Sequence, residues 1–594
     1  MAFKVLSGRL VSVLCSGLIC SSNGSSSRRR GTMSEFILNN EGVWFEKPAK
    51  KEGEQPNLIW VCSPLNVLAV TRDHNNENHG KLLRFCDFDG IEHKWALPLE
   101  LLAGDGTAYR QELLSRGVRL AENKTCRELL SRYIQSCNPA ARMRCVTQLG
   151  WYGELYVLSN ETIGNAVGEE VVFQSPIPLT EHYNSRGSLQ EWQQHVAKYC
   201  VDNSRLAFSM SVGFAAPLLH LLGEENGGFN LRGQSSGGKT TALKVSLSVY
   251  GGEKMMHSWR ATSNGLESIA AMHNDSLLCL DELGKLEPKI AGETAYLLVN
   301  GTGKQRATKS GLARKRQEWR MLFLSSGEVG LPDLIRQSGQ KVRGGHEVRI
   351  VDIPAFTDKY GVFEHLHFIP SGNEFSRLLC ANAEKYHGTA GKAFLSALIK
   401  DMSQNLDRVR TLIDDFKRKN TPLNADGQVL RVLNRLALVA AAGSLATELG
   451  ITGWTREDAF WAAQICFEAW LKNRGGLSAQ EGQEILRQVR RYFEQHGDSR
   501  FATFDSEGDQ KTVNRAGYRK WVNEGVHYFV LSESFKQDVW TGFDLAIAID
   551  VLKERGWLIA GSDGKNTRAE NLPCATSTTR CYRLDGNRMF ADDI

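Results

Sequence analysis

The 594 residues are 42% hydrophobic and 23% charged, a composition typical of globular proteins, and their number allows about three or four domains. The formal net charge at pH 7 is only +5, which is too small for the overall charge alone to attract an anionic partner. Such a partner would need a local basic patch. The 13 cysteines include no Cys-x-x-Cys pair, which argues against a disulfide framework or a structural zinc site and predicts a reducing, cytoplasmic location.

Residues 1–32 differ from the rest of the chain. Leu10 to Cys20 is an apolar run too short to cross a bilayer, and it is similar to the core of a signal peptide. However, Arg9 interrupts its apolar side and no small-x-small cleavage site is evident. Because Met33 opens globular-looking sequence, we interpret 1–32 as a start codon assigned too early, with a targeting segment as the alternative. We expect no other stretch to be apolar enough for a transmembrane helix, and no membrane partner.

Residues 33–205 are predicted to form a mixed α+β amino-terminal domain. Short β-rich runs such as Ile59 to Cys62 alternate with helical stretches such as Lys124 to Cys137. No catalytic constellation is evident in this range. Asp87 and Asp89 form an Asp-x-Asp pair, for which a metal site is the alternative to a turn. Because Asp89 precedes a glycine between two strand-like runs, a hairpin turn is favoured.

Residues 206–372 are predicted to form the α/β core of a P-loop ATPase, and the phosphate loop is its strongest signal. Gly233 to Thr240 reads Gly-Gln-Ser-Ser-Gly-Gly-Lys-Thr between a predicted strand, Phe229 to Arg232, and a predicted helix, Thr240 to Val249. In such a loop, backbone N–H groups and the helix dipole hold phosphate oxygens. Lys239 would reach the β- and γ-phosphates of ATP, and the Thr240 hydroxyl would bind Mg²⁺. The predicted nucleotide ligands are Gly233, Gly237, Gly238, Lys239, Thr240 and Thr241.

A Walker B motif is the second predicted element of this core. Ser276 to Glu282 is an apolar strand that ends in two acidic residues. Asp281 is expected to hold Mg²⁺ through its water shell, and Glu282 to polarise the attacking water. A buried strand that happens to end in acids is the alternative, which the spacing from Lys239 disfavours. Since kinases must exclude water, Glu282 favours hydrolysis over phosphoryl transfer to a small molecule.

Two further segments complete the predicted catalytic set. Met321 to Glu328 is another apolar strand with a polar tip, where ATPases with an additional strand place sensor 1, usually an asparagine; here Ser325 or Ser326 would have to orient the water. Arg349 opens a strand-like segment, where ring-forming ATPases place an arginine finger that completes the neighbouring subunit's site. A surface arginine on an edge strand is the alternative. The predicted catalytic residues are Lys239, Glu282, Ser325 and Arg349.

A basic insertion lies between the Walker B strand and the sensor strand. Ser310-Gly311 is a natural turn, so strand, turn and strand predict a hairpin that projects from the core. In a hexamer such hairpins line the central channel, where cations follow a phosphate backbone without reading bases. A solvated basic loop is the alternative. The predicted DNA contacts are Lys304, Arg306, Lys309, Arg314, Lys315 and Arg316.

The last two predicted domains are a helical lid, 373–475, and a winged-helix domain, 478–594. Ala-rich periodicity through Val429 to Leu449 indicates lid helices, and Gly475-Gly476 marks a linker. Helices followed by a late β-ribbon are the basis for the winged-helix prediction.

Three other candidates receive structural interpretations. His365 and His367 share one face of a strand, but no nearby Cys or Asp cluster completes a ligand set, so a structural pair is favoured over a metal site. Cys279 lies in an apolar strand and is interpreted as a packing residue rather than a nucleophile. Trp259 is assigned to the core rather than to a nucleotide contact.

Several of these segments together resemble the domain of unknown function (DUF) 927 family. The resemblance covers roughly residues 38–330 closely and the helical segment to 475 more loosely. The family occurs in bacteria, phages and integrating mobile elements and is described as a candidate helicase or ATPase; related cassette proteins are similar to minichromosome-maintenance helicases. The resemblance therefore implies an AAA+-like homo-hexameric ring with a pre-sensor hairpin, and a sensor-2 arginine at Arg431 or Arg435. The segments are Gly150 to Gly153, Gly233 to Thr241, Trp259 to Glu267, Cys279 to Leu283, Tyr296 to Lys304 and Leu324 to Glu328.

Two functions remain open from the sequence. The first is an ATP-hydrolysing DNA helicase or translocase of a phage or integrating mobile element. The second is an ATP-dependent switch or defence regulator that assembles without unwinding nucleic acid. DNA-stimulated ATP hydrolysis distinguishes the first from the second.

Overall fold

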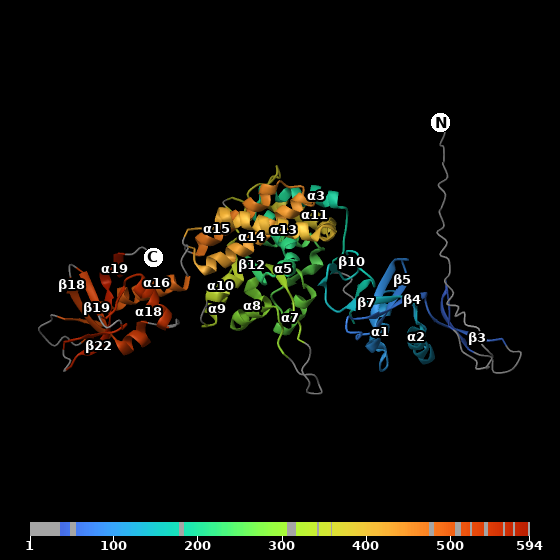
Figure 1. The fold of residues 1–594 in the computed structure, drawn as a ribbon, viewed down its shortest axis with the longest axis horizontal. Coiled ribbons are helices and arrows are strands. Elements are labelled where there is room, and N and C mark those ends of the chain that lie inside the picture. The colour runs from blue at the N-terminus through green and yellow to red at the C-terminus, as the bar shows by residue number, and fades with distance from the viewer. Residues whose placement is uncertain are drawn as a thin grey trace. The chain divides into compact units, whose positions relative to one another are not determined.

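In this computed structural model the chain forms two compact units. Figure 1 labels the helices and strands along the chain. The first consists of Met1–Val67, Leu83–His93 and Gly106–Asn138, and the second of Leu68–Leu82, Lys94–Asp105 and Pro139–Ile594. The predicted extension 1–32 lies outside the described residues. The structure describes residues 36–47, 55–176, 183–305, 316–340, 344–357, 359–423, 425–474, 480–504, 512–522, 525–539, 545–561, 565–573 and 577–591.

The first unit contains a small antiparallel sheet and two helices. Strands β1 (Phe36–Asn39), β2 (Gly42–Lys47) and β3 (Asn57–Cys62) pair in the order β1-β2-β3. Helices α1 (Thr107–Ser115) and α2 (Lys124–Ser136) follow in the chain. Helix α2 confirms the helix predicted there, and it begins after Asn123, whose side chain accepts a hydrogen bond from the Cys126 N–H.

The Asp87–Asp89 segment in this unit is a turn. The Asp87 carboxylate accepts hydrogen bonds from the backbone N–H groups of Asp89 and Ile91, each at 2.9 Å, and lies 2.9 Å from His93 Nε2. The His93 contact is the largest cause of a lowered Asp87 pKa. These local partners agree with the turn interpretation, in which an aspartate side chain replaces a backbone acceptor.

The amino-terminal part of the second unit holds short strands. Strand β4 (Leu65–Arg72) pairs through Val70–Arg72 with β7, which also pairs with β11, and both pairings are parallel. Strands β8, β9 and β10 form an antiparallel sheet in that order. The remaining bounds are β5 (Gly80–Cys86), β6 (Glu92–Pro98), β7 (Arg142–Val146), β8 (Gly150–Tyr152), β9 (Leu155–Val157), β10 (Thr162–Ile163), β11 (Val171–Phe173) and α3 (Leu189–His195).

A five-stranded parallel sheet forms the centre of the second unit. Its order is β13-β14-β15-β12-β16, so β15 lies between the strand before the phosphate loop and the Walker B strand. Arg232 is paired with both Gly327 and Pro354, which brings the carboxyl ends of three strands to one edge. The strands are β12 (Gly227–Arg232), β13 (Met256–Ser258), β14 (Ser276–Asp281), β15 (Met321–Gly327) and β16 (Ile350–Pro354).

Helices cover both faces of this sheet, which explains its continuous apolar runs. Alternate residues of β14 point to opposite faces. Leu277 and Cys279 belong to a core cluster with residues of α4 and α6, whereas Leu278 and Leu280 belong to another with residues of α7 and α8. The flanking helices are α4 (Ser204–Ala215), α5 (Leu218–Leu222), α6 (Lys239–Leu247), α7 (Ser263–Met272), α8 (Ala291–Asn300), α9 (Leu331–Gln337) and α10 (Gly344–Arg349).

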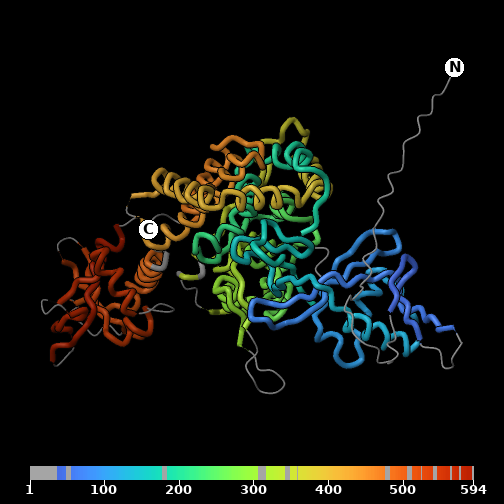
Figure 2. The backbone as a smooth tube through the Cα atoms, turned by 45° about the vertical axis from the view of Figure 1, so that its right-hand side comes forward, coloured from blue at the N-terminus to red at the C-terminus, as the bar shows by residue number. Residues whose placement is uncertain are grey.

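Five longer helices follow the sheet, in the range predicted to be helical. They are α11 (Gly372–Lys385), α12 (Thr389–Lys400), α13 (Met402–Asn420), α14 (Gly427–Glu448) and α15 (Arg456–Arg474). Helix α14 packs against α13, α15 and α4. The yellow and orange tubes of Figure 2 show α13, α14 and α15 together.

Helix α14 is also long and apolar enough to cross a membrane, with a mean hydropathy of 1.5 over its most apolar window. The expectation that no such stretch exists beyond the first 32 residues is therefore wrong by composition. However, 78% of that window is buried inside the protein, as in the core helix of a folded domain.

Residues 480–591 have a core of their own, which includes Ile485, Val489, Val530, Trp557 and Leu584. The sequence predicts helices and a late ribbon here, and the structure has a six-stranded sheet. Its strand β18 lacks an apolar run, because Arg519, Lys520 and the exposed Trp521 interrupt it. The elements are α16 (Gln480–His496), β17 (Phe501–Thr503), β18 (Gly517–Val522), β19 (Gly525–Leu531), α18 (Leu545–Glu554), β20 (Leu558–Ile559), β21 (Arg568–Glu570), β22 (Thr579–Asp585) and α19 (Gly586–Ala591).

Candidate active site

The predicted phosphate loop connects β12 to α6, as the sequence indicates. Helix α6 begins at Lys239, directly after Gly238. The Lys239 ammonium donates hydrogen bonds to the carbonyl oxygens of Gly233 (2.8 Å) and Gln234 (2.5 Å), so it lies over its own loop. An ammonium held there, at the amino end of a helix, is placed to meet an anion.

The loop packs against the segment that follows β16. A Cβ atom at Gly237 would overlap the ring of Phe356, so only glycine allows this close approach. The Gly237 carbonyl oxygen accepts a hydrogen bond from the Val362 N–H at 2.9 Å. The loop is thus supported by residues that are distant in sequence.

Two strand ends and the start of α6 bring hydroxyl and carboxylate groups together beside the loop. Thr240 Oγ1 lies 3.4 Å from Asp281 Oδ1, and Ser326 Oγ lies 2.5 Å from the same oxygen. The Ser326 hydroxyl also accepts a hydrogen bond from the Glu282 N–H at 3.1 Å. The structure therefore brings together the predicted loop, the Walker B acids and the tip of the sensor strand.

The Thr240–Asp281 pair suits a magnesium ion. Both groups offer the hard oxygen atoms that Mg²⁺ prefers, and this ion commonly takes one or two protein ligands and completes its shell with phosphates and water. Within the described residues, no cluster of three or more His, Cys, Asp or Glu side chains forms a metal site. The oxygen atoms of Thr240 and Asp281 therefore fit a Mg²⁺ ion that binds together with a nucleotide.

The charge around Lys239 is balanced by acids. Burial lowers the pKa of Lys239, and Glu328, Asp281 and Glu282 oppose that shift. Glu328 was not among the predicted site residues, although it follows β15 directly. Three carboxylates thus lie near one ammonium, and a divalent cation would offset their excess negative charge.

Glu282 has an unusual backbone for a non-glycine residue. Its φ of 64° and ψ of 72° lie in the left-handed region, which costs on the order of 1 kcal/mol and is found most often at functional sites. Its side chain is half exposed and pairs with Lys285 Nζ at 2.5 Å. The predicted base therefore lies at the correct edge of the sheet, with a lysine as its partner.

Ser325 and Ser326 occupy different environments. Ser325 is fully buried, and its hydroxyl accepts a hydrogen bond from Trp259 Nε1 at 2.8 Å. Trp259 is itself fully buried, in agreement with its assignment to the core. Of the two serines, only Ser326 contacts the Walker B acids, although Ser325 is in the predicted set.

Arg349 lies at the opposite edge of the sheet from the phosphate loop. It ends α10, and the next residue, Ile350, pairs with Gly228 near the start of β12. The length of β12 places this edge about 17 Å from the loop. The guanidinium lies 4.1 Å from the Tyr296 ring and donates to the Gly345 carbonyl oxygen at 2.8 Å. Arg349 therefore cannot serve the site of its own chain.

The arginines implied for sensor 2 do not contact the loop. Arg435 donates to the Val348 carbonyl oxygen at 2.6 Å, at the same edge as Arg349, and burial lowers its pKa to about 10. Arg431 is exposed on α14. Position on a helix in the predicted range is thus insufficient to assign this role.

A cavity of about 840 Å³ adjoins the loop and shares Phe356 with it. Arg205 in its wall donates two hydrogen bonds, each of 3.0 Å, to the Pro354 carbonyl oxygen. No pattern in the sequence marks Phe356 as a site residue, because it lies after a strand and outside any motif. The cavity is lined by Arg205, Pro354, Phe356, Thr357, Lys359, Glu364, Ile465, Ala469, Lys472 and Asn473.

The structure describes only the two ends of the basic insertion. Gly303 N donates to the Gln317 carbonyl oxygen at 2.8 Å, and Thr302 bridges Glu318 in antiparallel fashion, as expected for the base of a hairpin. Arg316 is exposed, whereas Lys304 forms an ion pair with Glu293 at 2.7 Å. The predicted contacts Arg306, Lys309, Arg314 and Lys315 lie outside the described residues.

The remaining candidates agree with structural roles, although His365 and His367 lie in a loop and not on the predicted strand, and His367 has a positive φ of 48°. The rings of His365 and His367 lie 4.5 Å apart, and His367 Nε2 lies 3.0 Å from the Val201 carbonyl oxygen. Burial raises the pKa of the Cys279 thiol, which disfavours a nucleophilic thiolate.

Comparison with known proteins supports the family resemblance and the mixed α/β architecture. Residues 36–318 match the family described as "Domain of unknown function (DUF927)", which confirms the resemblance over that range. The fold is similar to that of a solved structure described as "SCCmec type IV Cch - active helicase", with a TM-score of 0.68 and 15% identity, over 94% of this chain and 99% of that one. At this identity the likeness shows a shared mixed α/β fold, with a parallel sheet and helices. No curated protein matches the chain in sequence.

Proposed function

We propose that this protein is an ATP-hydrolysing DNA helicase or translocase of the AAA+-like class that acts as a homo-hexamer in a phage or integrating mobile element. The observation that carries the proposal is the meeting of Thr240, Asp281 and Ser326 beside a phosphate loop. The position of β15 between β12 and β14 supports an ATPase with an additional strand. The likeness in fold to a protein described as an active helicase supports the choice of motor over switch.

In this proposal the loop binds the phosphates of ATP, and Lys239 turns from its loop carbonyls to the β- and γ-phosphates. Thr240 and Asp281 hold Mg²⁺, directly or through water, and the ion neutralises charge on the phosphates. The adenine base of ATP occupies the neighbouring cavity, where Phe356 offers a partly exposed aromatic face for stacking. The remaining wall combines aliphatic and polar side chains, as ordinary ligand cavities do.

Hydrolysis is assigned to Glu282 and Ser326. Glu282 leaves Lys285 and accepts a proton from the attacking water. Ser326 takes the sensor position in place of Ser325, because its hydroxyl contacts both Asp281 and the Glu282 N–H. Arg349 acts in a neighbouring subunit's site, since it lies at the far edge of its own sheet.

DNA binding is assigned to the basic insertion, with Arg316 as its described exposed cation. The antiparallel base of the insertion supports a projecting hairpin. Lys304 is a weaker candidate than its neighbours, because Glu293 already pairs with it.

ATP hydrolysis with and without single-stranded DNA, combined with native mass measurement, tests the proposal. We expect a hexamer whose hydrolysis rises with DNA and is lost in Lys239→Ala but kept in Lys254→Ala, which removes an exposed lysine. ATP-driven assembly with hydrolysis indifferent to DNA would instead establish the switch.

A triple substitution tests the insertion separately. Arg306→Ala, Arg314→Ala and Arg316→Ala together should reduce DNA stimulation and the salt dependence of DNA binding. The matched control replaces the exposed cations Arg410, Arg418 and Lys419 of α13 and removes the same charge. Equal DNA stimulation in both triple variants would exclude the insertion as the DNA contact.

A further inference from the structure

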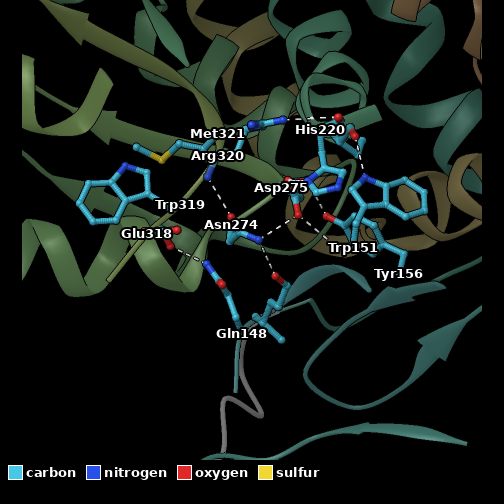
Figure 3. Close-up of polar contacts among 12 residues, drawn as sticks. Gln148, Trp151, Tyr156, His220, Asn274, Asp275, Glu318, Trp319, Arg320 and Met321 are labelled. Carbon is cyan, nitrogen blue, oxygen red and sulfur yellow. Dashed lines mark hydrogen bonds and ion pairs between the residues drawn. The ribbon is translucent and has the colours of Figure 1, made fainter. Parts of the chain in front are cut away.

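The segment Gly150 to Gly153, which belongs to the family motifs but has no part in the site above, contacts the amino end of β14, one of the site strands. Figure 3 shows this polar network, in which Trp151 lies next to Asn274 and Asp275. Asp275 immediately precedes β14, and Arg320 immediately precedes β15. At their carboxyl ends these same strands carry Asp281 and Ser326.

Asp275 is the centre of the network. Its side chain is 1% exposed, and its Oδ2 accepts hydrogen bonds from the Trp151 N–H (3.0 Å) and from Asn274 Nδ2 (2.9 Å). Its carbonyl oxygen accepts a hydrogen bond from the Tyr156 hydroxyl at 2.7 Å. Its Oδ1 lies 3.7 Å from His220 Nδ1. The carboxylate thus accepts two hydrogen bonds at Oδ2, whereas Oδ1 is buried without a hydrogen bond from any described residue. A buried carboxylate in this state is costly, and its two hydrogen bonds fix the Trp151 N–H and the Asn274 amide.

The surroundings of Gly150 explain why the segment Gly150 to Gly153 begins with glycine. A Cβ atom at this position would lie 2.6 Å from Asp275 Oδ2 and 2.9 Å from Asn274 Nδ2, and the residue has a φ of 99°. Both the space and the backbone conformation require glycine. The turn is thus shaped to bring the Trp151 N–H to the carboxylate.

The same network holds the strand that returns from the basic insertion. The Arg320 carbonyl oxygen accepts from the Asp275 N–H at 2.5 Å, and the Arg320 N–H donates to Asn274 Oδ1 at 2.8 Å. Arg320 Nη1 also lies 3.4 Å from the His220 carbonyl oxygen. Glu318 lies two residues before Arg320, nearer the insertion, and its carbonyl oxygen accepts a hydrogen bond from Gln148 Nε2 at 2.5 Å. The turn therefore contacts the amino end of β14, and Gln148, just before the turn, contacts the returning arm.

We propose that Asp275 is a positioning residue, which holds the amino ends of β14 and β15 to each other and to the Gly150–Trp151 turn. Through this connection, a displacement of the basic insertion is transmitted along the two strands to Asp281 and Ser326. Two adjacent strands in a close-packed sheet move as rigid rods, so a shift at one end appears at the other.

The phosphate loop follows β12, whose amino end is joined to the returning arm by Asn226 rather than by Asp275: Asn226 Nδ2 donates to the Trp319 carbonyl oxygen at 3.1 Å, and Asn226 Oδ1 accepts from the Met321 N–H at 3.0 Å. Substitution of Asp275 leaves these contacts in place, so we expect nucleotide binding and DNA-coupled turnover to be separable. This inference rests on the proposed DNA-stimulated hydrolysis.

The test uses the full-length protein and measures kcat and KM for ATP with and without single-stranded DNA. Asp275→Ala should lower the ratio of stimulated to basal kcat about threefold or more, while the KM for ATP stays unchanged. Asp275→Asn keeps the shape and an acceptor for Trp151, so it should restore part of the ratio.

Gln148→Ala provides a second variant, because Gln148 is exposed and its loss breaks only the Glu318 contact among the hydrogen bonds above. It should lower the same ratio with an unchanged melting temperature, whereas Thr147→Ala, an exposed neighbour, should not. If Asp275→Ala fails to fold, Gln148→Ala decides the outcome.

Full DNA stimulation in folded Asp275→Ala and in Gln148→Ala would overturn the positioning role and leave the proposed function intact. A wild-type protein whose hydrolysis ignores DNA would overturn both.

Discussion

Ser325 and Ser326 are adjacent on β15, and their side chains face opposite sides of the sheet. Sequence alone names both as candidates, because either hydroxyl is suitable for a sensor. The contacts separate them: Ser325 accepts from Trp259, and Ser326 contacts Asp281 and Glu282. The two serines therefore provide a matched pair of substitutions.

Ser326→Ala should reduce kcat for ATP by about tenfold or more, because a water-orienting hydroxyl and a support of Asp281 are lost together. Ser325→Ala should instead lower the free energy of unfolding by about 1–3 kcal/mol, since the Trp259 indole N–H is left buried without its acceptor. Steady-state kinetics and chemical denaturation of both variants measure this. The opposite pattern would return the sensor role to Ser325.

Asp352 gives a prediction for pH. Burial raises its pKa to about 6; the side-chain hydrogen bond from Asn230 and the charge of Arg232 oppose that shift, and Asp333 adds to it. A folded-state pKa above the unfolded one means that burying the carboxylate costs stability above about pH 6. That cost disappears as the pH falls through about 6 toward 4.

The free energy of unfolding of the wild type, relative to Asp352→Asn, should therefore rise by about 1 kcal/mol between pH 7 and pH 5. The amide in the variant does not titrate, so other groups cancel in the difference. Denaturant titrations of both proteins at the two pH values provide the comparison. A difference that falls with decreasing pH would contradict the assignment.

At the scale of elements, the sequence predicted those strands and loops that a short run of neighbouring residues specifies. The strands at Phe229 to Arg232 and Ser276 to Glu282 are apolar runs that end in loop or acidic residues, and both are present. The phosphate loop lies between a strand and a helix, as its glycine pattern requires. Local sequence pattern was thus sufficient to locate the two strands and the predicted phosphate loop of the candidate site.

Contacts between distant segments could not be predicted in this way. Phe356 supports the loop only because β16 pairs with β12, which no local pattern reveals. Arg435 has a suitable position in the sequence, but the packing of α14 directs it to Val348. The partner of Gly150, Asp275, also follows from tertiary structure alone.

Phe356 allows a test of the element that supports the loop. Phe356→Ala should raise the Kd for ATP about tenfold, because it removes an aromatic face from the cavity and a contact from Gly237. Phe368→Ala, which removes a fully exposed aromatic ring, is the matched control. Fluorescent-nucleotide titration measures both. Unchanged affinity in Phe356→Ala would place the base elsewhere.

At the scale of the whole molecule, the position of Arg349 requires a second subunit if this residue is catalytic. Arg349→Ala and Glu282→Gln should each be inactive alone. Mixed together, they form interfaces in which one subunit supplies Glu282 and the other Arg349, and random mixing makes about a quarter of interfaces complete. Recovered hydrolysis on mixing is the expected result, and its absence, with mixed hexamers present, would remove Arg349 from the site.

Strand displacement tests the central claim most directly. A partly duplex DNA with a fluorescent strand is incubated with ATP and the wild-type protein, Glu282→Gln, or Glu287→Gln, which changes an exposed glutamate a few positions along the chain. We predict that the wild type and Glu287→Gln release the labelled strand, and that Glu282→Gln binds ATP without releasing it. ATP hydrolysis by the wild type with no strand release and no movement along DNA would contradict the motor.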